Sequence, residues 1–314
     1  SACHNIYVAA GEFEMTGGTS SFSKADGIII KQDATASITG GTSETHTKHG
    51  IHNDGKTTLG KVTVIESGIV NGPKGTLDLD GTYVKGSYVF ALSNEGGTVT
   101  AKNFSTKNCE AIAICNLSGK MDLKDINLEG GRDGNISIIA GEVNITGAVL
   151  DKCREKSVSI SGGKVNLKDI DVQGTSGKFN GVYVFGGELY MEDATIANTG
   201  DCGFRVDQAG YAEVKNVTIK DTESTAIFGG RGTIVMDGVT AENIGGHGVY
   251  NTGGKVTISN FNIKKVRNVI QQRNGETIIN NIVADEMELG AYCQEGLLSI
   301  NGGKFTNSAS RVKN

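Results

Sequence analysis

Three absences narrow the fold class at the outset. The sequence has a single proline, Pro73, no tryptophan, and no apolar run of the roughly 18 residues that a membrane-spanning helix needs. It also lacks a basic stripe, because both charge signs are mixed along the chain and the net charge is −5, which argues against nucleic acid as a partner. Glycine, in contrast, supplies 46 of the 314 residues, as in an all-β chain of short strands and glycine-dependent turns.

The N-terminus has none of the sections of a signal peptide and opens instead on the strand-like segment NIYVAAGEFEM. We therefore expect the sequence to be a fragment of a longer protein. No segment has the composition of a linker, and solenoids of this length form a single unit. We expect one domain over residues 1–314, without direct insertion into a membrane.

A repeat of about 22 residues runs through most of the chain. Eleven copies each begin at a glycine, and successive starts lie 21 to 24 residues apart. The third and fifth residues of a copy are almost always apolar, as in Val143 and Ile145, which is the two-residue period of a strand. The copies start at Gly75, Gly97, Gly119, Gly141, Gly163, Gly187, Gly210, Gly232, Gly254, Gly275 and Gly296.

The seventh residue of every copy is Gly, Asn or Asp, the residue types that tolerate positive φ. This pattern predicts a left-handed corner, after which the apolar alternation resumes at positions eight and ten in a second strand. The predicted corner residues are Gly81, Asn103, Asp125, Gly147, Asp169, Asp193, Asn216, Gly238, Asn260, Asn281 and Gly302.

A third short apolar run precedes each copy, as in GVYVF at 181–185 and GVYN at 248–251. Three short strands per 22 residues cannot close a core of their own, so each copy must stack on the next. The sequence thus predicts an all-β fold, a right-handed single-stranded parallel β-helix of about 13–14 coils. The repeat slips between His49 and Gly75, where we predict an insertion or protruding loop near residues 53–75.

The 22-residue coil, the Asn/Asp/Gly corner and the stacked aliphatic positions resemble the pectate lyase-like superfamily of β-helices, most of all its bacterial adhesin and autotransporter passenger domains. The resemblance covers nearly the whole chain as architecture. It implies a fold that carries lyases, hydrolases and adhesins alike, so it does not choose among these functions.

Polygalacturonase-like members of that superfamily use clustered aspartates in motifs such as NTD and DD, with GHG and RIK nearby. This chain has GHG at 246–248 and NTGD at 198–201 but neither DD nor RIK, and His247 occupies a position where other coils place a turn residue. If the chain is an enzyme, we expect its carboxylates to be Asp169, Asp193 and Asp201, because stacked acids can supply the roughly 5–10 Å spacing of glycoside cleavage. The corner aspartates also offer oxygen ligands for Ca²⁺, but backbone geometry explains them, so we expect no cofactor.

His46, His49 and His52 form H-x-x-H-x-x-H, a spacing that occurs in zinc sites. Alternate residues of a strand point in opposite directions. We therefore do not expect the three side chains to converge, and we predict no metal site.

The six cysteines are even in number but fall mostly at different repeat positions. Cys109 and Cys153 share a position two coils apart, which exceeds the reach of a disulfide. We expect most cysteines to be thiols that behave as small apolar residues, with Cys109 and Cys115 the one near pair.

Outward strand positions are mostly Thr, Asn, Asp, Glu and Ser, and a long polar face suits an extended or large partner better than a deep pocket does. Aromatic residues gather in consecutive coils between about 180 and 250, and those that point outward are candidate contact residues. The binding residues that we expect are Tyr183, Tyr190, Arg205, Tyr211, Arg231 and Tyr250.

These observations predict an extracellular binding domain on the surface of a bacterial cell. The expected partner of this monomer is a host protein or glycan, whether a glycoprotein, a mucin or an immunoglobulin. One alternative is a polysaccharide lyase or glycoside hydrolase that acts on acidic glycans, and another is a passive stalk. A cleft favours the enzyme, whereas a flat or convex face favours the binder.

Overall fold

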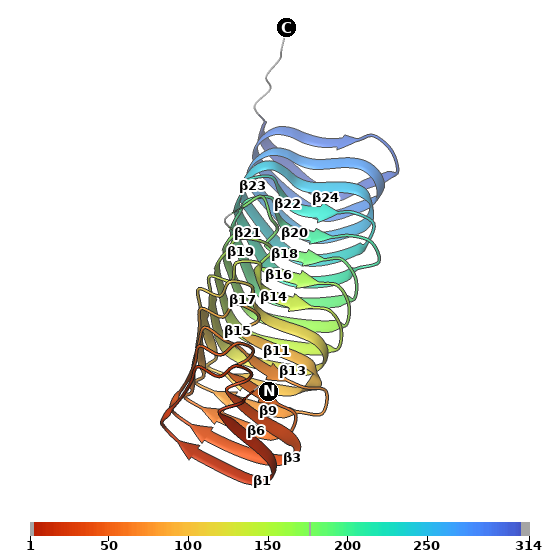
Figure 1. The fold of residues 1–314 in the computed structure, drawn as a ribbon. Coiled ribbons are helices and arrows are strands. Elements are labelled where there is room, and N and C mark those ends of the chain that lie inside the picture. Colours follow the sequence, from red (N-terminus) through yellow and green to blue (C-terminus); the bar gives the residue numbers. More distant parts are fainter. Residues whose placement is uncertain (1–2, 176, 309–314) are drawn as a thin grey trace. The chain divides into compact units, whose positions relative to one another are not determined.

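The computed structural model describes residues 3–175 and 177–308, and every regular element in them is a β-strand. The chain divides into two compact units, Ser1–Arg154 (unit 1) and Glu155–Asn314 (unit 2). In each unit the strands pair in parallel and stack in successive coils (Figure 1). The predicted right-handed parallel β-helix is confirmed, with about 14 coils of roughly 22 residues in all. No helix able to cross a membrane occurs among the described residues.

Unit 1 contains fifteen strands among its described residues. Their bounds are β1 Ile6–Thr16, β2 Thr19–Ser21, β3 Ile28–Thr39, β4 Thr42–Glu44, β5 Ile51–Asn53, β6 Lys56–Gly60, β7 Thr63–Ile65, β8 Ile69–Asn71, β9 Thr76–Asp80, β10 Tyr83–Lys85, β11 Leu92–Lys102, β12 Ser105–Lys107, β13 Ile112–Glu129, β14 Gly134–Ile138 and β15 Glu142–Cys153.

Unit 2 contains the other nine, and β23 is long because it continues through several corners. Their bounds are β16 Val158–Ile160, β17 Lys164–Thr175, β18 Val182–Val184, β19 Glu188–Thr199, β20 Cys202–Val206, β21 Tyr211–Thr222, β22 Thr225–Gly229, β23 Thr233–Cys293 and β24 Leu297–Ser308.

The core of each unit is a column of aliphatic side chains that repeat from coil to coil. In unit 1, Leu77 pairs with Val99, Val99 with Met121 and Met121 with Val143, and all four are at most 1% exposed. Each such side chain contributes about 1.5–3 kcal/mol relative to an exposed position. Strand alternation therefore fixes which residues point outward.

The eleven predicted corner residues all adopt positive φ, from 52° at Asn103 to 81° at Gly302. The corner is confirmed, and its asparagines also bond to the coil before them. Asn216 Nδ2 donates to Asp193 Oδ1 at 3.1 Å, and Asn260 Nδ2 donates to Asp237 Oδ1 at 2.8 Å. A second left-handed corner ends the second strand of each coil, for example at Lys152 and Asn243. Residue type alone does not predict this corner, because Lys and Glu occupy it as well as Gly, Asn and Asp.

Residues 53–75, where an insertion or loop was expected, instead contain β6, β7 and β8, which pair in register with the coils on either side. Only 18 residues separate Ile51 from its partner Ile69, whereas 23 separate Ile28 from Ile51. The slip in the repeat is therefore a shortened coil. This coil packs closely on the next one at Gly68, because a Cβ on Gly68 would lie 1.9 Å from the carbonyl oxygen of Phe90.

A buried ladder of asparagines lines one turn of unit 1, at the end of the third strand of each coil. Asn53 donates to Asn71 at 2.7 Å, Asn71 donates to Asn94 at 2.9 Å, and Asn94 donates to Asn116 at 2.9 Å. All four are fully buried, so these bonds offset the cost of removing amides from water. In the sequence, this asparagine ladder is visible as the recurrent Asn that ends IHN, IVN, LSN and ICN.

The thiols of Cys109, Cys115 and Cys202 are buried and not joined by disulfides. Burial raises the pKa of all three, and that of Cys115 to about 11, so they are protonated at neutral pH. They act as small apolar core residues, as expected.

Candidate functional site

The third strand of each coil in unit 2 presents one outward side chain between two buried ones. Val182 and Val184 are fully buried, and Tyr183 between them points outward. The register places Tyr183 beside Arg205, Arg205 beside Phe228, and Phe228 beside Tyr250 on successive coils. We call these four residues the aromatic–arginine ladder.

The ladder is held together by stacking. The guanidinium carbon of Arg205 lies 4.3 Å from the centre of the Phe228 ring and 5.6 Å from that of Tyr183. Phe228 and Tyr250 meet edge to face with their centres 5.4 Å apart. Cation–π and edge-to-face contacts of this kind contribute about 0.5–1.5 kcal/mol each, so the four side chains support one another as a surface.

Asp207 holds the Arg205 side chain in place. Its Oδ2 accepts a hydrogen bond from Arg205 Nε at 2.8 Å, lies 2.7 Å from Nη2, and accepts a third contact from the Tyr183 hydroxyl at 3.2 Å. Burial opposes the charge of Arg205, but the hydrogen bond and attraction of Asp207 outweigh it and raise the pKa of the guanidinium. Burial first, and then the charge of Asp207, raise the pKa of Tyr183. Both groups therefore keep their protons at neutral pH.

A cation lies at each end of the ladder. Lys156 Nζ is 5.0 Å from the centre of the Tyr183 ring, and the Arg273 guanidinium is 5.6 Å from that of Tyr250. Neither makes an ion pair with a carboxylate of the described chain, unlike Arg205. With rungs about 4.8 Å apart, the two cations are separated by a distance on the order of 20 Å. Their charges remain available to an anionic ligand that lies along the ladder.

His247 adds a titratable group beside Tyr250. Its ring centre is 4.9 Å from that of Tyr250, and Nδ1 lies 3.2 Å from Asn268 Nδ2. Burial, and then the charges of Arg267 and Arg273, lower the pKa of His247 below its usual value, so the ring is neutral at pH 7. The GHG motif alone predicts a turn position for His247, because the sequence does not reveal which side chains surround the ring.

The six predicted binding residues fall into three groups. Tyr183, Arg205 and Tyr250 belong to the ladder, whose fourth member, Phe228, is not among the six predicted residues. Tyr190 and Tyr211 form a separate pair on the first strands β19 and β21, with ring centres 6.0 Å apart. Arg231 is exposed in the turn after β22. A neighbouring aromatic, Phe204, is fully buried in the core.

The Tyr190–Tyr211 pair is tied to charged neighbours. Lys164 Nζ lies 5.4 Å from the centre of the Tyr190 ring, and the Tyr190 hydroxyl donates to Glu188 at 3.2 Å. The Tyr211 hydroxyl contacts Glu213 at 3.4 Å. Because both hydroxyls face carboxylates, this pair presents a more acidic surface than the ladder does.

The three candidate catalytic aspartates do not share one site. Asp169 and Asp193 occupy the same corner on adjacent coils, where each has positive φ, and Asp193 contacts Lys168 at 3.8 Å and accepts from Asn216. Asp201 lies outside that corner, in the turn between the end of β19 at Thr199 and the start of β20 at Cys202. Their catalytic and Ca²⁺-binding roles remain predictions, and the observed contacts are structural.

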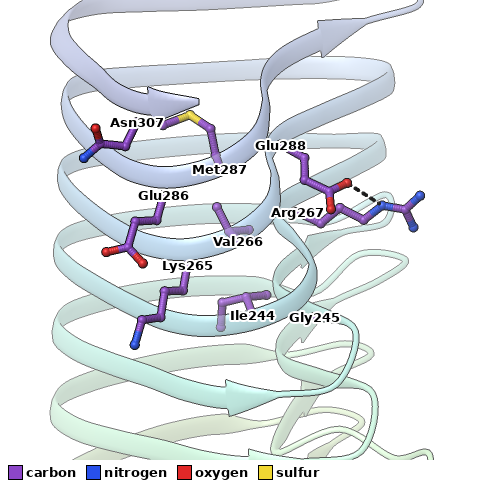
Figure 2. A pocket seen from close by; sticks show the side chains of 9 residues that line it. All are labelled: Ile244, Gly245, Lys265, Val266, Arg267, Glu286, Met287, Glu288 and Asn307. Atoms are coloured by element: carbon purple, nitrogen blue, oxygen red, sulfur yellow. Dashed lines mark ion pairs between the residues drawn. The ribbon is translucent and has the colours of Figure 1, made fainter. Parts of the chain in front are cut away.

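One shallow hollow of unit 2 is lined by residues at and beside the second corner of its coils, and no ladder residue is among them. It measures about 510 Å³, and Figure 2 shows the charged side chains along it, including the ion pair of Arg267 and Glu288 at 3.5 Å. No aromatic side chain lines it, and acids and bases are mixed. Its lining is Ile244, Gly245, Lys265, Val266, Arg267, Glu286, Met287, Glu288 and Asn307.

A search of family models and a search of curated proteins each find no match to this chain. Among solved structures, the chain is similar to a periplasmic alginate epimerase, AlgG, with 9% identity and a TM-score of 0.48 over 91% of this chain and 78% of the other. It is similar to the catalytic domain of a GH87 α-1,3-glucanase in complex with nigerose, with 14% identity and a TM-score of 0.46 over 95% of this chain.

The chain spans 64% of the length of that glucanase domain. An endo-xylogalacturonan hydrolase from Aspergillus tubingensis is also similar, with 9% identity and a TM-score of 0.28 over 90% of this chain and 88% of the other. At such identities the likeness concerns the coil architecture alone.

Proposed function

We propose that this chain binds an extended acidic glycan along the aromatic–arginine ladder of unit 2. The observation that carries the proposal is the alignment of Tyr183, Arg205, Phe228 and Tyr250 on four successive coils. Sugar rings present C–H faces that stack on aromatic side chains and hydroxyls that bond to polar ones. A row of such groups, held rigid by strands, suits a polymer that runs from coil to coil.

The unpaired cations at the ends of the ladder favour an acidic polymer over a neutral one. Lys156 and Arg273 each contact a ladder ring but no carboxylate of the described chain. Burial of a partner next to these charges is favourable only if it brings a compensating anion. Uronate or sulfate groups along a glycan supply that anion at regular spacing.

The predicted extracellular setting is retained, and the predicted partner is narrowed from a host protein or glycan to an acidic glycan. An extracellular position on a bacterial surface would expose the ladder to host or environmental glycans, including those of glycoproteins and mucins. A binding role for immunoglobulin has no support in the chemistry of the ladder. The outward row of strand residues favours recognition of a polymer over enclosure of a small ligand, and no ladder residue lines the hollow of unit 2 described above.

The experiment is a binding titration of the purified chain with polygalacturonate, alginate and hyaluronan, and with uncharged dextran as a control. Phe228→Ala and Tyr250→Ala should each weaken binding about tenfold, which corresponds to ~1.4 kcal/mol for a contact residue. Tyr88→Ala is the matched control, because Tyr88 is an exposed tyrosine of unit 1 at 65%. Equal binding by all three variants, or equal binding of dextran, contradicts the proposal.

A second candidate function, chemistry on the bound uronate, is favoured by His247. A neutral imidazole can accept the proton from the carbon next to a carboxylate, and the guanidinium of Arg273 can stabilise the charge that develops there. Return of a proton to the opposite face inverts that carbon. Loss of the adjacent glycosidic oxygen, protonated by the Tyr250 hydroxyl, instead leaves a carbon–carbon double bond.

Two assays separate this chemistry from binding alone. Elimination produces an unsaturated uronate that absorbs in the ultraviolet, and epimerisation in D₂O introduces deuterium at the inverted carbon. His247→Gln should abolish either signal and leave glycan binding within about twofold of native. If the native chain binds polyuronate but gives neither signal, the ladder is a binding site only.

A further inference from the structure

Four of the five histidines lie within the first 52 residues, and they do not share one role. His46 is buried, its Nδ1 accepts the backbone amide of Ser23 at 3.1 Å, and its Nε2 lies 3.1 Å from Ser43 Oγ. Both ring nitrogens are therefore used inside the core, and burial lowers the pKa of His46. His4, His49 and His52 lie on the outside instead.

The register brings these three histidines around one aspartate. Ile6, Ile28 and Ile51 pair on successive coils, so the residues two positions before them, His4, Asp26 and His49, follow the same order. His52 points outward from β5, next to Ile51. One side chain each from the first two coils and two from the third thus meet at one place.

Each of the three histidines approaches the Asp26 carboxylate with its Nδ1 atom. His49 Nδ1 lies 2.7 Å from Asp26 Oδ1, whereas His4 Nδ1 and His52 Nδ1 lie 3.5 and 4.0 Å from Asp26 Oδ2. The buried Nδ1 atom of His4 makes no hydrogen bond with the described residues. Three imidazole nitrogens therefore face one carboxylate, and two of them stand too far away for a good hydrogen bond.

Asp26 is a buried acid that forms no ion pair with a lysine or arginine among the described residues. Its side chain is 5% exposed, and its carboxylate contacts only these imidazole nitrogens among the described residues. A buried carboxylate requires a compensating positive charge. Neutral imidazoles supply lone pairs but no charge, so a cation placed among them satisfies both kinds of group.

Asp54 supports His52 from the far side. Asp54 Oδ1 lies 3.4 Å from His52 Nε2, and Asp54 Oδ2 lies 2.6 Å from Lys31 Nζ. A carboxylate behind a ligating imidazole fixes the tautomer in which the opposite nitrogen carries the lone pair. In this case that nitrogen is Nδ1, the atom that faces Asp26.

We propose that Asp26, His49 and His52, together with His4, bind one Zn²⁺ ion in unit 1. Three nitrogens and one oxygen are a ligand set that Zn²⁺ accepts in tetrahedral geometry, with bonds of about 2.0–2.1 Å and ligand atoms therefore roughly 3.3 Å apart. The ligand atoms of Asp26, His49 and His52 already lie within 4.8 Å of one another. Small side-chain rotations close the remaining gap.

The ion would join three successive coils, and it can enter from solvent. The side chains of His4, His49 and His52 are 23%, 29% and 25% exposed. Binding to the folded state alone raises the melting temperature. The proposal does not depend on glycan binding, which is placed in unit 2.

The test is a titration of the metal-stripped full chain with ZnCl₂, followed by calorimetry and by elemental analysis of the dialysed protein. We expect one Zn²⁺ per chain with Kd below about 1 µM at pH 7 and a higher melting temperature. Co²⁺ should give the intense visible bands of tetrahedral coordination. Asp26→Asn and the double variant His49→Gln/His52→Gln should lose the ion, and Asp54→Asn should bind it about 10–100-fold more weakly.

His247→Gln is the matched histidine control and should keep full Zn²⁺ binding. Far-ultraviolet circular dichroism checks that each variant is folded. If Asp26→Asn does not fold, the solvent-facing double variant His49→Gln/His52→Gln provides the test. Native protein that binds no Zn²⁺, or a folded double variant that binds it as native does, overturns the proposal.

Discussion

The guanidinium carbon of Arg205 lies 4.3 Å from the centre of the Phe228 ring on the next coil, and strand pairing holds the two residues at that spacing. A cation and an aromatic face are thus fixed in contact before any ligand arrives. A ligand that stacks on this pair loses less conformational entropy than one that must order the side chains itself.

The contact between Arg205 and Phe228 should be measurable in the free protein. We predict a coupling of about 0.5–1 kcal/mol in a double-mutant cycle of Arg205→Met and Phe228→Leu, followed by urea unfolding. Both replacements keep apolar volume, so the cycle isolates the cation–π part. Additivity of the two single effects would show that the contact contributes nothing.

Asp207→Asn removes the charge that faces Tyr183. Because the carboxylate raises the pKa of Tyr183 in addition to burial, the variant should titrate this tyrosine at lower pH than the native chain does. Spectrophotometric titration, with Tyr183→Phe to identify the transition, measures the change. The same variant leaves Arg205 half-buried without its partner and should reduce stability by roughly 1–3 kcal/mol. An unchanged tyrosine titration would contradict the contact.

Stability should fall as the pH drops below about 6.5. The pKa of His247 is lowered in the folded chain, so the unfolded state binds the proton more readily. The contribution of neutral His247 to the free energy of unfolding is therefore complete above the usual pKa of 6.5 and is lost as the pH falls below it. Melting temperatures between pH 7.5 and 5 test this. His247→Gln should flatten the decrease but not remove it, since His46 shifts in the same direction. A native curve that rises toward pH 5 would contradict the sign.

Asn94→Ala should destabilise unit 1 by about 2–4 kcal/mol. The fully buried amide of Asn94 accepts from Asn71 and donates to Asn116, so the variant removes one buried hydrogen bond from each neighbour and leaves a cavity. Asn127→Ala is the control, because Asn127 is exposed on a strand of the same unit. Urea unfolding measures both. A loss no greater for Asn94→Ala than for Asn127→Ala would mean that the ladder is not a source of stability.

The sequence predicted the features that depend on residue type at a fixed place in the repeat. Gly147 and Asn216 mark the first corner because few residues tolerate positive φ, and Val143 and Ile145 mark the core by alternation. Contacts between coils were harder to predict because coil lengths vary. Twenty-four residues separate Ser159 from Tyr183, but 22 separate Tyr183 from Arg205.

Variable coil length is also the reason why the cluster at Asp26 could not be predicted from the sequence. The spacing of His46, His49 and His52 resembles that of zinc ligands, but strand alternation predicts that the three side chains do not all converge. His46 does point inward. Asp26 contacts His49 and His52 but lies in a turn one coil earlier. Only the register of Ile28 with Ile51 brings Asp26 beside His49.

The most direct test of the central claim is the NMR spectrum of the chain with ¹³C-labelled tyrosine and phenylalanine rings, recorded during titration with a defined oligouronate. The account predicts saturable shifts of the Tyr183, Phe228 and Tyr250 rings, with Tyr88 and Phe22 unchanged although both are exposed. Binding that shifts other rings and leaves these three in place would contradict the assignment of the ladder as the glycan site.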